Sequence, residues 1–180
     1  MKIIALVLCI AITVTLTGCD LSEEFFSKKL WEKDMFDRFY NTDEDQAHKY
    51  FEQIIKSIEN QDIDMMRPLF ASDVILSTDL DSQIRELLSF CAGNLISYDI
   101  SGPGSHASRE DEIYYKEIFV SYDFSTTEGN YRMAYLVCTI NSEHPEKVGL
   151  QSVYIIKAEE SDLTYAYWGD NEWTPGITIE

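Results

Sequence analysis

Acidic, tyrosine and histidine residues in the second half of the chain are the ones whose types could transfer protons. A buried carboxyl beside a phenol or an imidazole can act as a general acid or base when its surroundings shift its pKa. The candidates on predicted strands and in one loop are Asp99, His106, Tyr114, Tyr115, Tyr122 and Asp123. Their spacing matches no catalytic motif, and a tyrosine on a strand is commonly a cross-strand packing residue. We therefore expect no catalytic residue and a protein that is not an enzyme.

Metal binding is the second chemistry to consider, because acidic residues are so numerous. Positions 1, 3, 5 and 12 of a calcium loop are matched by Asn41, Asp43, Asp45 and Glu52. However, Gln46 stands where such a loop needs glycine, so Asp43 and Asp45 are better explained as helix-capping acids. The three histidines are widely separated and unpaired with cysteine: His48, His106 and His144. The sequence predicts no metal site and no cofactor.

Aromatic residues gather near the end of the chain. Tyr165, Tyr167, Trp168 and Trp173 lie among the turn-forming residues of 169–171 and 175–176. These side chains could line a ligand pocket or a protein contact surface, or they could simply close the open end of the fold. The candidate ligand-binding residues are Tyr122, Tyr135, Tyr167, Trp168 and Trp173.

The elements that must position these residues begin with helices. Apolar residues at helical spacing predict a helix over 47–58, with Thr42 and Asp45 as a capping box. Asp62 is the expected N-cap of a short second helix that Pro68 limits. A brief apolar run at 74–76 predicts a strand. Helical spacing returns over 80–91, and Gly93 is the expected C-cap of this third helix.

From residue 95 onward the apolar period changes from 3.6 to 2. The predicted strands are 95–100, 113–124, 131–141, 148–157 and 163–168, with a loop at 102–105. In 113–124, Ile118, Val120, Tyr122 and Phe124 share one face. Strands that are apolar on both faces suggest a sheet with helices on one side and partial exposure or pairing on the other. The predicted fold class is α+β, with three N-terminal helices packed on a curved antiparallel sheet of four to six strands.

This order of elements resembles the nuclear transport factor 2-like fold, a cone-shaped α+β domain. The resemblance covers residues 43–168 and includes the runs Tyr50-Phe51-Glu52, 62–66 and Leu69-Phe70-Ala71. The chain also resembles uncharacterised Gram-positive lipoproteins that carry a domain of unknown function. The likeness implies a pocket between the third helix and the curved sheet, and it allows a homodimer formed through the sheet. It implies no single function, because this scaffold hosts many unrelated tasks.

The first 18 residues have the layout of a secretory signal. Lys2 precedes an apolar run, Ile3 to Val14, that is about half the length needed to span a bilayer. Leu16-Thr17-Gly18-Cys19 resembles the lipobox of bacterial lipoproteins, in which the cysteine is acylated before cleavage. The alternative is an ordinary signal with a chance cysteine. The resemblance implies a diacylglyceryl anchor on Cys19 and a location at the cell membrane, facing outside the cytoplasm.

The chain is thus expected to have three parts. Residues 1–18 are the signal, residues 19–41 form a tether and a possible amphipathic helix, and residues 42–180 form the folded domain. Residues 20–41 are rich in aromatic side chains over a broad arc, so they either dock on the domain, form a loose tether or lie at the lipid interface. Of the four cysteines only Cys91 and Cys138 belong to the domain, where buried thiols are favoured over a disulfide.

The net charge of the chain limits the kinds of binding partner to be expected. Without residues 1–18 the chain keeps 13 basic and 32 acidic residues, a net charge of −19, which disfavours nucleic acid as a partner. The leading hypothesis is a non-enzymatic binding domain, anchored at the surface, for a small or peptidic ligand. The alternative is a protein-interaction or immunity-type lipoprotein whose acidic surface meets an envelope protein or a basic toxin. An isomerase- or dehydratase-like enzyme ranks third.

Overall fold

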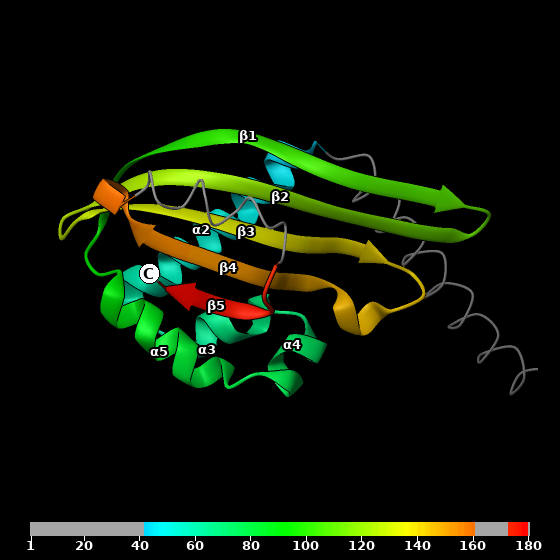
Figure 1. The fold of residues 1–180 in the computed structure, drawn as a ribbon, viewed down its shortest axis with the longest axis horizontal. Coiled ribbons are helices and arrows are strands. Elements are labelled where there is room, and N and C mark those ends of the chain that lie inside the picture. Colours follow the sequence, from blue (N-terminus) through cyan, green and yellow to red (C-terminus); the bar gives the residue numbers. More distant parts are fainter. Residues whose placement is uncertain (1–41, 161–172, 180) are drawn as a thin grey trace, which may run out of the picture. The chain divides into compact units, whose positions relative to one another are not determined.

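The computed structural model describes residues 42–160 and 173–179, which all lie in one compact unit, Asn41–Glu180. Its helices are α2 (Asp43–Asn60), α3 (Ile63–Met66), α4 (Ser72–Ser77) and α5 (Leu80–Phe90). Its strands are β1 (Leu95–Glu110), β2 (Ile113–Thr126), β3 (Asn130–Asn141), β4 (Gly149–Lys157) and β5 (Gly176–Ile179). Short 3-10 turns are η1 (Arg67–Leu69), η2 (Pro145–Lys147) and η3 (Ala158–Glu160). The domain is α+β, as predicted, with the helices preceding the sheet (Figure 1).

The longest helix, α2, forms where the sequence predicts it. The Thr42 hydroxyl accepts a hydrogen bond from the backbone N–H of Asp45 at 3.2 Å, so the expected cap is in place. Buried residues at helical spacing then give the helix its core-facing side: Ala47, Phe51, Ile54, Ile55 and Ile58. The helix ends at Asn60, and the left-handed backbone of its C-cap, Gln61, directs the Gln61 N–H to the Ile58 carbonyl. None of the helices in the described ranges is both long and apolar enough to cross a bilayer.

Of the two short helices that follow α2, one was predicted and the other replaces a predicted strand. Asp62 caps α3 by accepting a hydrogen bond from the Met65 N–H at 3.1 Å, as predicted. The strand predicted at 74–76 is wrong, because these residues belong to helix α4. Val74 is buried and Leu76 is exposed, and the Thr78 N–H donates to the Val74 carbonyl in a helical bond. Three adjacent apolar residues do not by themselves distinguish a strand from one turn of helix.

The third predicted helix is α5. Its buried side consists of Leu80, Ile84, Leu87 and Leu88. The helix ends earlier than expected, since Cys91 is the C-cap and Gly93 lies two residues beyond it.

The five strands form one sheet in the order β1-β2-β3-β4-β5. The first four pair antiparallel as a meander, whereas β5 pairs with β4 in parallel. The purely antiparallel sheet that the sequence predicted is therefore wrong at this last strand. The strand predicted at 163–168 lies outside the described residues, as do Cys19 and the whole of 1–41.

Strand β1 is longer than predicted, because the expected loop at 102–105 lies within it. Pairing with β2 is irregular between Ser101 and Gly104 and then continues to Glu110. Pro103 is tolerated because β1 is an edge strand whose outer side needs no ladder donor. The Phe119 ring of β2 covers Gly104 so closely that a Cβ there would lie 1.9 Å from a ring carbon.

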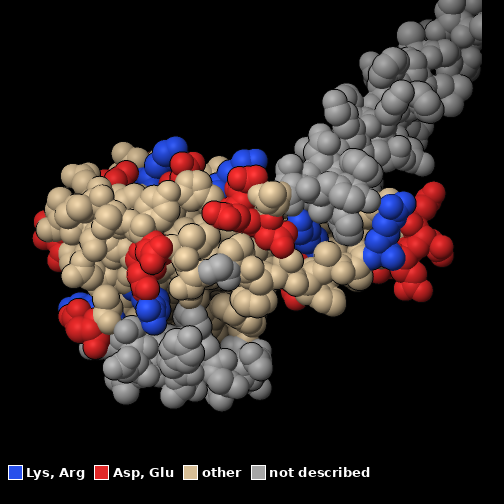
Figure 2. Space-filling model, turned by 90° about the horizontal axis from the view of Figure 1, so that it is seen from above, with Lys and Arg blue, Asp and Glu red and all other residues tan. Residues whose placement is uncertain are grey.

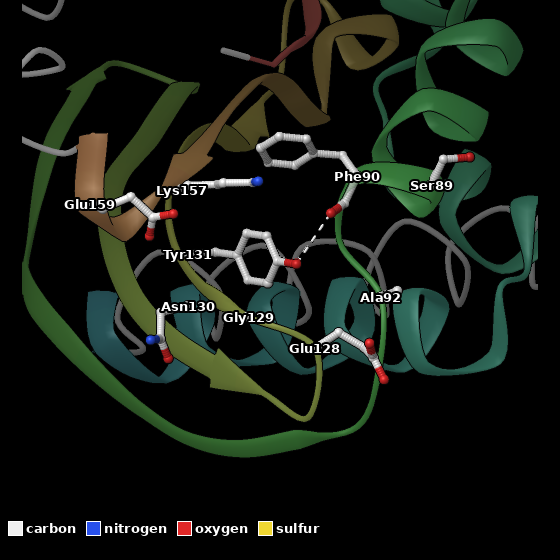
Figure 3. A pocket seen from close by; sticks show the side chains of 9 residues that line it. All are labelled: Ser89, Phe90, Ala92, Glu128, Gly129, Asn130, Tyr131, Lys157 and Glu159. Atoms are coloured by element: carbon white, nitrogen blue, oxygen red, sulfur yellow. Dashed lines mark hydrogen bonds between the residues drawn. The ribbon is translucent and has the colours of Figure 1, made fainter.

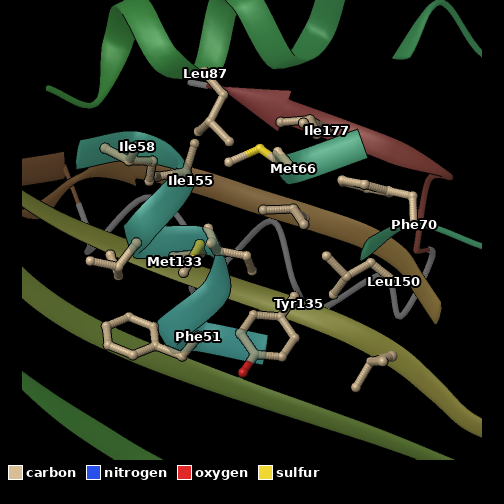
Figure 4. Packing of buried hydrophobic residues seen from close by; sticks show 14 of the residues in the cluster. Phe51, Ile58, Met66, Phe70, Leu87, Met133, Tyr135, Leu150, Ile155 and Ile177 are labelled. Carbon is tan, nitrogen blue, oxygen red and sulfur yellow. The ribbon is translucent and has the colours of Figure 1, made fainter. Parts of the chain in front are cut away.

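The core lies between the helices and one face of the sheet (Figure 4). On β2 the buried residues alternate as predicted, and they are Ile118, Val120, Tyr122 and Phe124. On β3 the residues of the core cluster are Tyr131, Met133, Tyr135 and Val137, and Ala134, Cys138, Thr139 and Ile140 are buried as well. The opposite face is mixed. Arg132 forms a two-pronged ion pair with Asp123 there, at 2.6 and 2.8 Å, while Phe119 is 49% exposed.

An ion pair joins the start of α2 to β2. Lys116 is 4% exposed, and its Nζ lies 2.8 Å from Oδ1 of Asp43. The Ser105 hydroxyl donates to the other carboxylate oxygen of Asp43. Burial alone would raise the pKa of Asp43, but the hydrogen bonds from Lys116 and Ser105 outweigh it and the net pKa is lowered.

Replacing Lys116 by methionine should lower the free energy of unfolding by about 2 kcal/mol at neutral pH, because it removes a hydrogen bond between charged groups. The lowered pKa of Asp43 means that this contribution is present above the ordinary pKa of 3.8 and is lost as the pH falls below it. In urea titrations, the difference in the free energy of unfolding between the variant and the natural chain should therefore be smaller at pH 3 than at pH 7. The exposed Lys56→Met is the control; an equal loss in both variants would contradict the prediction.

The two cysteines of the domain are free and buried, as the sequence favoured. Burial raises the pKa of the Cys91 thiol to about 12 and that of Cys138 to about 11. Neither sulfur is therefore a thiolate at neutral pH, and neither is a nucleophile in the folded domain.

Candidate functional site

A cleft of about 530 Å³ opens where the end of α5 meets the β2–β3 turn and the neighbouring ends of β3 and β4 (Figure 3). Its lining residues are Ser89, Phe90, Ala92, Glu128, Gly129, Asn130, Tyr131, Lys157 and Glu159. The sequence placed a pocket between the third helix and the sheet, and this cleft lies at one end of that junction.

The floor of the cleft is aromatic. Tyr131 is almost fully buried, and its hydroxyl donates to the Phe90 carbonyl at 3.2 Å. The two rings meet edge to face with centroids 5.7 Å apart, and the ring of Phe124 stacks on Tyr131 with centroids 5.4 Å apart. Burial raises the pKa of the Tyr131 phenol, so it stays neutral and acts as a fixed donor at the end of α5.

The turn that forms one wall is held by hydrogen bonds from its own residues. The Thr126 hydroxyl donates to the Ala92 carbonyl at 2.7 Å and accepts from the Glu128 N–H. The Thr126 N–H also donates to the Gly129 carbonyl at 2.8 Å. These bonds attach the turn to the segment that follows α5, so the wall and the floor are positioned together.

The rim carries charges of both signs. In Figure 3, Lys157 and Glu159 lie on one side of the cleft, Glu128 lies on the other, and the Lys157 ammonium points inward near the rings of Phe90 and Tyr131. Glu128, Lys157 and Glu159 are all exposed, so their charged groups are hydrated.

A second, smaller hollow of about 180 Å³ lies between the start of α2 and strands β1 and β2. Its lining residues are Glu44, Asp45, His48, Tyr98, Ile100 and Tyr122. The His48 and Tyr98 rings have centroids 5.4 Å apart, and their polar atoms, Nε2 and the hydroxyl, are 3.5 Å apart. Tyr122 is completely buried and stacks on Phe51 at 4.0 Å.

Two of the five predicted ligand-binding residues come together. The rings of Tyr122 and Tyr135 stack with centroids 6.0 Å apart on the core side of the sheet. Tyr135 is fully buried and its hydroxyl donates to the Ala47 carbonyl of α2 at 2.5 Å. Tyr135 is thus a packing residue that joins β3 to α2, whereas Tyr122 lines the smaller hollow.

Trp173 is separated from these two tyrosines. Its ring meets Tyr154 edge to face at 5.4 Å, and Tyr154 alternates along β4 with the core residues Val153 and Ile155. Trp173 therefore belongs to the sheet face that points away from the core, and the expected aromatic cluster does not include it. Tyr167, Trp168 and the lipidation candidate Cys19 lie outside the described residues.

The acid–base candidates are spread over the sheet and do not converge. Asp99 and Asp123 are directly opposite in the β1–β2 register, on the face away from the core. The Tyr115 hydroxyl donates to Glu117, and the His106 ring lies 6.0 Å from the ring of Tyr115. Tyr114 lies under the guanidinium of Arg109 at 5.0 Å. Of the six candidates, Tyr122 lines the smaller hollow, and none lines the larger cleft.

The acids of the possible calcium loop have structural partners. Asp43 pairs with Lys116, and the Asp45 carboxylate accepts from the Thr42 hydroxyl at the cap of α2. Across residues 42–160 and 173–179, no three histidine, cysteine or acidic side chains are grouped as they would need to be to hold a metal ion.

The sequence did not reveal the residues that line the larger cleft. They come from four segments: the end of α5, the β2–β3 turn, the start of β3 and the end of β4. Glu128 and Asn130 look like ordinary turn residues, while Lys157 and Glu159 look like ordinary surface charges. Only the gap between the strands predicted at 113–124 and 131–141 pointed to this place.

These elements define a small α+β domain with a helical layer on a five-stranded sheet and a cleft at the end of α5. The family model for DUF5104, a domain of unknown function, matches residues 53–158, which is more than half of the sequence. The chain belongs to this family. The matched range runs from within α2 to the end of β4 and includes every cleft residue except Glu159. No curated protein matches the chain.

Proposed function

We propose that this protein is a ligand-binding domain outside the cytoplasm, held at the membrane by a lipid on Cys19, and that its ligand is a short peptide or an amino acid. The observation that carries the proposal is the cleft at the end of α5. Its volume of about 530 Å³ lies within the range of small-molecule pockets, roughly 300–1,000 Å³. Its floor is aromatic, but most of its exposed lining is polar, so a polar ligand suits it best.

The charges of the rim suggest the class of ligand. The Lys157 ammonium suits a carboxylate, while Glu128 and Glu159 suit an ammonium group. Asn130 and Ser89 add neutral hydrogen-bonding groups that suit a peptide backbone. A ligand with both a free amino group and a free carboxyl group would satisfy both signs of charge at once.

Binding accounts for this cleft better than catalysis. The pKa of Tyr131 is raised and its hydroxyl already donates to a backbone carbonyl, so it is a poor general base at neutral pH. Among the described cleft residues no hydrogen bond links a nucleophile to a base.

The fold and the anchor fit this role. The order of helices followed by a sheet supports a nuclear transport factor 2-like domain, which commonly encloses a pocket between its helices and its sheet. The net charge of −19 outside the signal keeps the domain away from the anionic membrane to which we propose it is tethered.

Native mass spectrometry of Asp20–Glu180 with a pool of dipeptides tests the proposal. Lys157→Met should raise the dissociation constant about tenfold or more, because it removes a charge-assisted hydrogen bond to the ligand. The exposed Lys147→Met, on η2 and outside the cleft, should leave the affinity unchanged. Dipeptides with an acetylated amino end and an amidated carboxyl end should not bind. Absence of any complex, or equal binding of the blocked peptides, would reject the proposal.

A protein-interaction role is the second candidate, and the β1–β2 hairpin favours it. This hairpin continues past the last residues that β3 pairs, and its exposed tip carries Arg109, Glu110, Asp111 and Glu112. Ile113 and Phe119 nearby are 40% and 49% exposed. Figure 2 shows acidic and basic side chains crowded together at this end of the molecule. A protein complex or a homodimer that weakens as salt is raised would support this candidate.

A further inference from the structure

Strand β1 lies at one edge of the sheet, and no strand within residues 42–160 and 173–179 pairs with its outer side (Figure 1). Its pairing with β2 is unbroken from Gly104 to Glu110, the end of the strand. All residues from Ser105 to Glu110 are exposed. This half of β1 is therefore an accessible strand edge, and such an edge can pair with another extended chain.

Two hydrogen bonds at the ends of β2 determine which backbone groups of β1 face outward. The Thr126 N–H donates to the Gly129 carbonyl in the β2–β3 turn. The Tyr114 carbonyl accepts from the N–H of Ser142, directly after β3. The even-numbered residues of β2 thus bond toward β3 and the odd-numbered ones toward β1, because bonding alternates along an antiparallel strand. The β1 residues opposite the even-numbered positions direct their N–H and C=O groups away from the sheet. These residues are Ser105, Ala107 and Arg109.

The first half of β1 is protected against strand pairing, whereas the second half is not. Pairing with β2 is irregular at two places before Gly104, and Pro103 has no N–H. The outward N–H of Ile100 already donates to the Asp99 carboxylate at 3.1 Å. Bulges and prolines keep an edge strand from adding a partner, and a donor that is already bonded cannot join a new ladder. Residues 104–110 contain none of these features.

The charges around this edge favour a cationic partner. The end of the hairpin carries three consecutive acids, Glu110, Asp111 and Glu112, and all are exposed. Arg109 precedes them, with its guanidinium carbon 5.0 Å from the centre of the Tyr114 ring. A basic segment would meet opposite charge here, whereas a second copy of the chain would bring its own net charge of −19 outside the signal.

We propose that the edge of β1 from Gly104 to Glu110 binds an extended basic segment of a partner protein by strand addition. The backbone of the segment bonds to the outward N–H and C=O groups of Ser105, Ala107 and Arg109, and its lysine or arginine side chains lie beside the acids at the end of the hairpin. None of the residues that line the cleft at α5 takes part. The edge is thus a site beyond the peptide cleft, and it gives the protein-interaction candidate a defined surface.

Titration of Asp20–Glu180 with a heptapeptide of alternating lysine and valine, acetylated at one end and amidated at the other, tests the proposal. Amide hydrogen exchange followed by NMR reports on the strand directly. With free peptide at about ten times its dissociation constant, the outward amides of Ser105, Ala107 and Arg109 should exchange about tenfold more slowly than in the free protein. The amides of His106 and Ser108, which already bond to β2, should change little.

Replacing Ala107 by proline removes one outward N–H and no bond to β2, and an edge strand tolerates proline at such a position. Ala107→Pro should raise the dissociation constant about fivefold or more, which corresponds to the loss of at least one hydrogen bond. Ala107→Val keeps the N–H and is the matched control, so its affinity should be unchanged. Glu112→Gln should also weaken binding, and a heptapeptide of alternating glutamate and valine should not bind.

Protection of all the β1 amides alike, or of none, would overturn the proposal, and so would equal affinities of Ala107→Pro and Ala107→Val. A dimer that forms without peptide and that Ala107→Pro dissociates would overturn it in favour of pairing between two copies of the chain. The blocked heptapeptide has no free ends for the cleft at α5. Lys157→Met should therefore leave this binding intact, so failure here is distinct from failure of the peptide cleft.

Discussion

Replacing Gly149 by alanine should lower the free energy of unfolding by about 3 kcal/mol or more. Gly149 begins β4 with a φ of +132°, a backbone region that costs other residues about 1–3 kcal/mol. An added Cβ would also lie 2.6 Å from the backbone nitrogen of Ala71 and 2.9 Å from the carbonyl carbon of Phe70. Backbone atoms cannot rotate away, so β4 and the start of α4 would have to separate.

Urea denaturation followed by far-UV circular dichroism measures this loss. Gly104→Ala is the control, because the added methyl group would meet only the half-exposed ring of Phe119, which can swing into solvent. We expect a cost below about 1.5 kcal/mol for the control, by analogy with small-to-large changes at sites that can adjust. Equal costs for the two variants would show that the contact between Gly149 and Ala71 is not tight.

Replacing Tyr135 by alanine should cost about 3–5 kcal/mol, the range for large-to-alanine changes of a buried aromatic ring. The Tyr135 ring joins β3 to α2: it stacks on Tyr122, and its hydroxyl donates to the Ala47 carbonyl of α2. Tyr135→Phe keeps the ring and should cost about 1 kcal/mol, the net value of one hydrogen bond. Thermal and urea unfolding of both variants would check this. If phenylalanine costs as much as alanine, the hydrogen bond and not the packing holds α2 to the sheet.

Prediction from the sequence is most accurate where an element buries one face made of regularly spaced apolar residues. The α2 helix has a cap at Thr42 and an apolar stripe from Ala47 to Ile58, and both local signals agree with the tertiary environment. The alternation in β2 is equally regular, since one face of this strand packs on the helices, whereas β3 is buried at several consecutive positions. For these elements the spacing of apolar residues determines which face is buried.

The sequence misleads where tertiary contacts decide the local structure. Residues 74–76 have no period, and the N-cap of the helix that contains them is Ala71, whose N–H donates to the Leu150 carbonyl of β4. Pro103 and Gly104 look like a loop, yet an edge strand tolerates a proline and the Phe119 ring packs on the glycine. Neither arrangement can be read from neighbouring residues, because both depend on partners that are distant in the chain.

The candidate site was predictable only in part. Tyr122 and Tyr135 were identified as strand residues, and their rings do stack. Trp173 does not join them, because it packs on Tyr154 on the other face of the sheet. The larger cleft depends on exposed polar residues from four segments, and exposed residues have no period that a sequence could display.

The contact between Phe70 and Leu150 has a consequence for the order of folding. This isolated parallel bridge joins residues 80 positions apart, whereas the β1–β2 and β2–β3 hairpins close over two or three residues. Closing a long loop costs more entropy than closing a short one, so the hairpins should form before the helices attach through Phe70. An interaction that forms late affects mainly the rate of unfolding. Weakening the contact at Gly149 should therefore speed unfolding while leaving the refolding rate nearly unchanged.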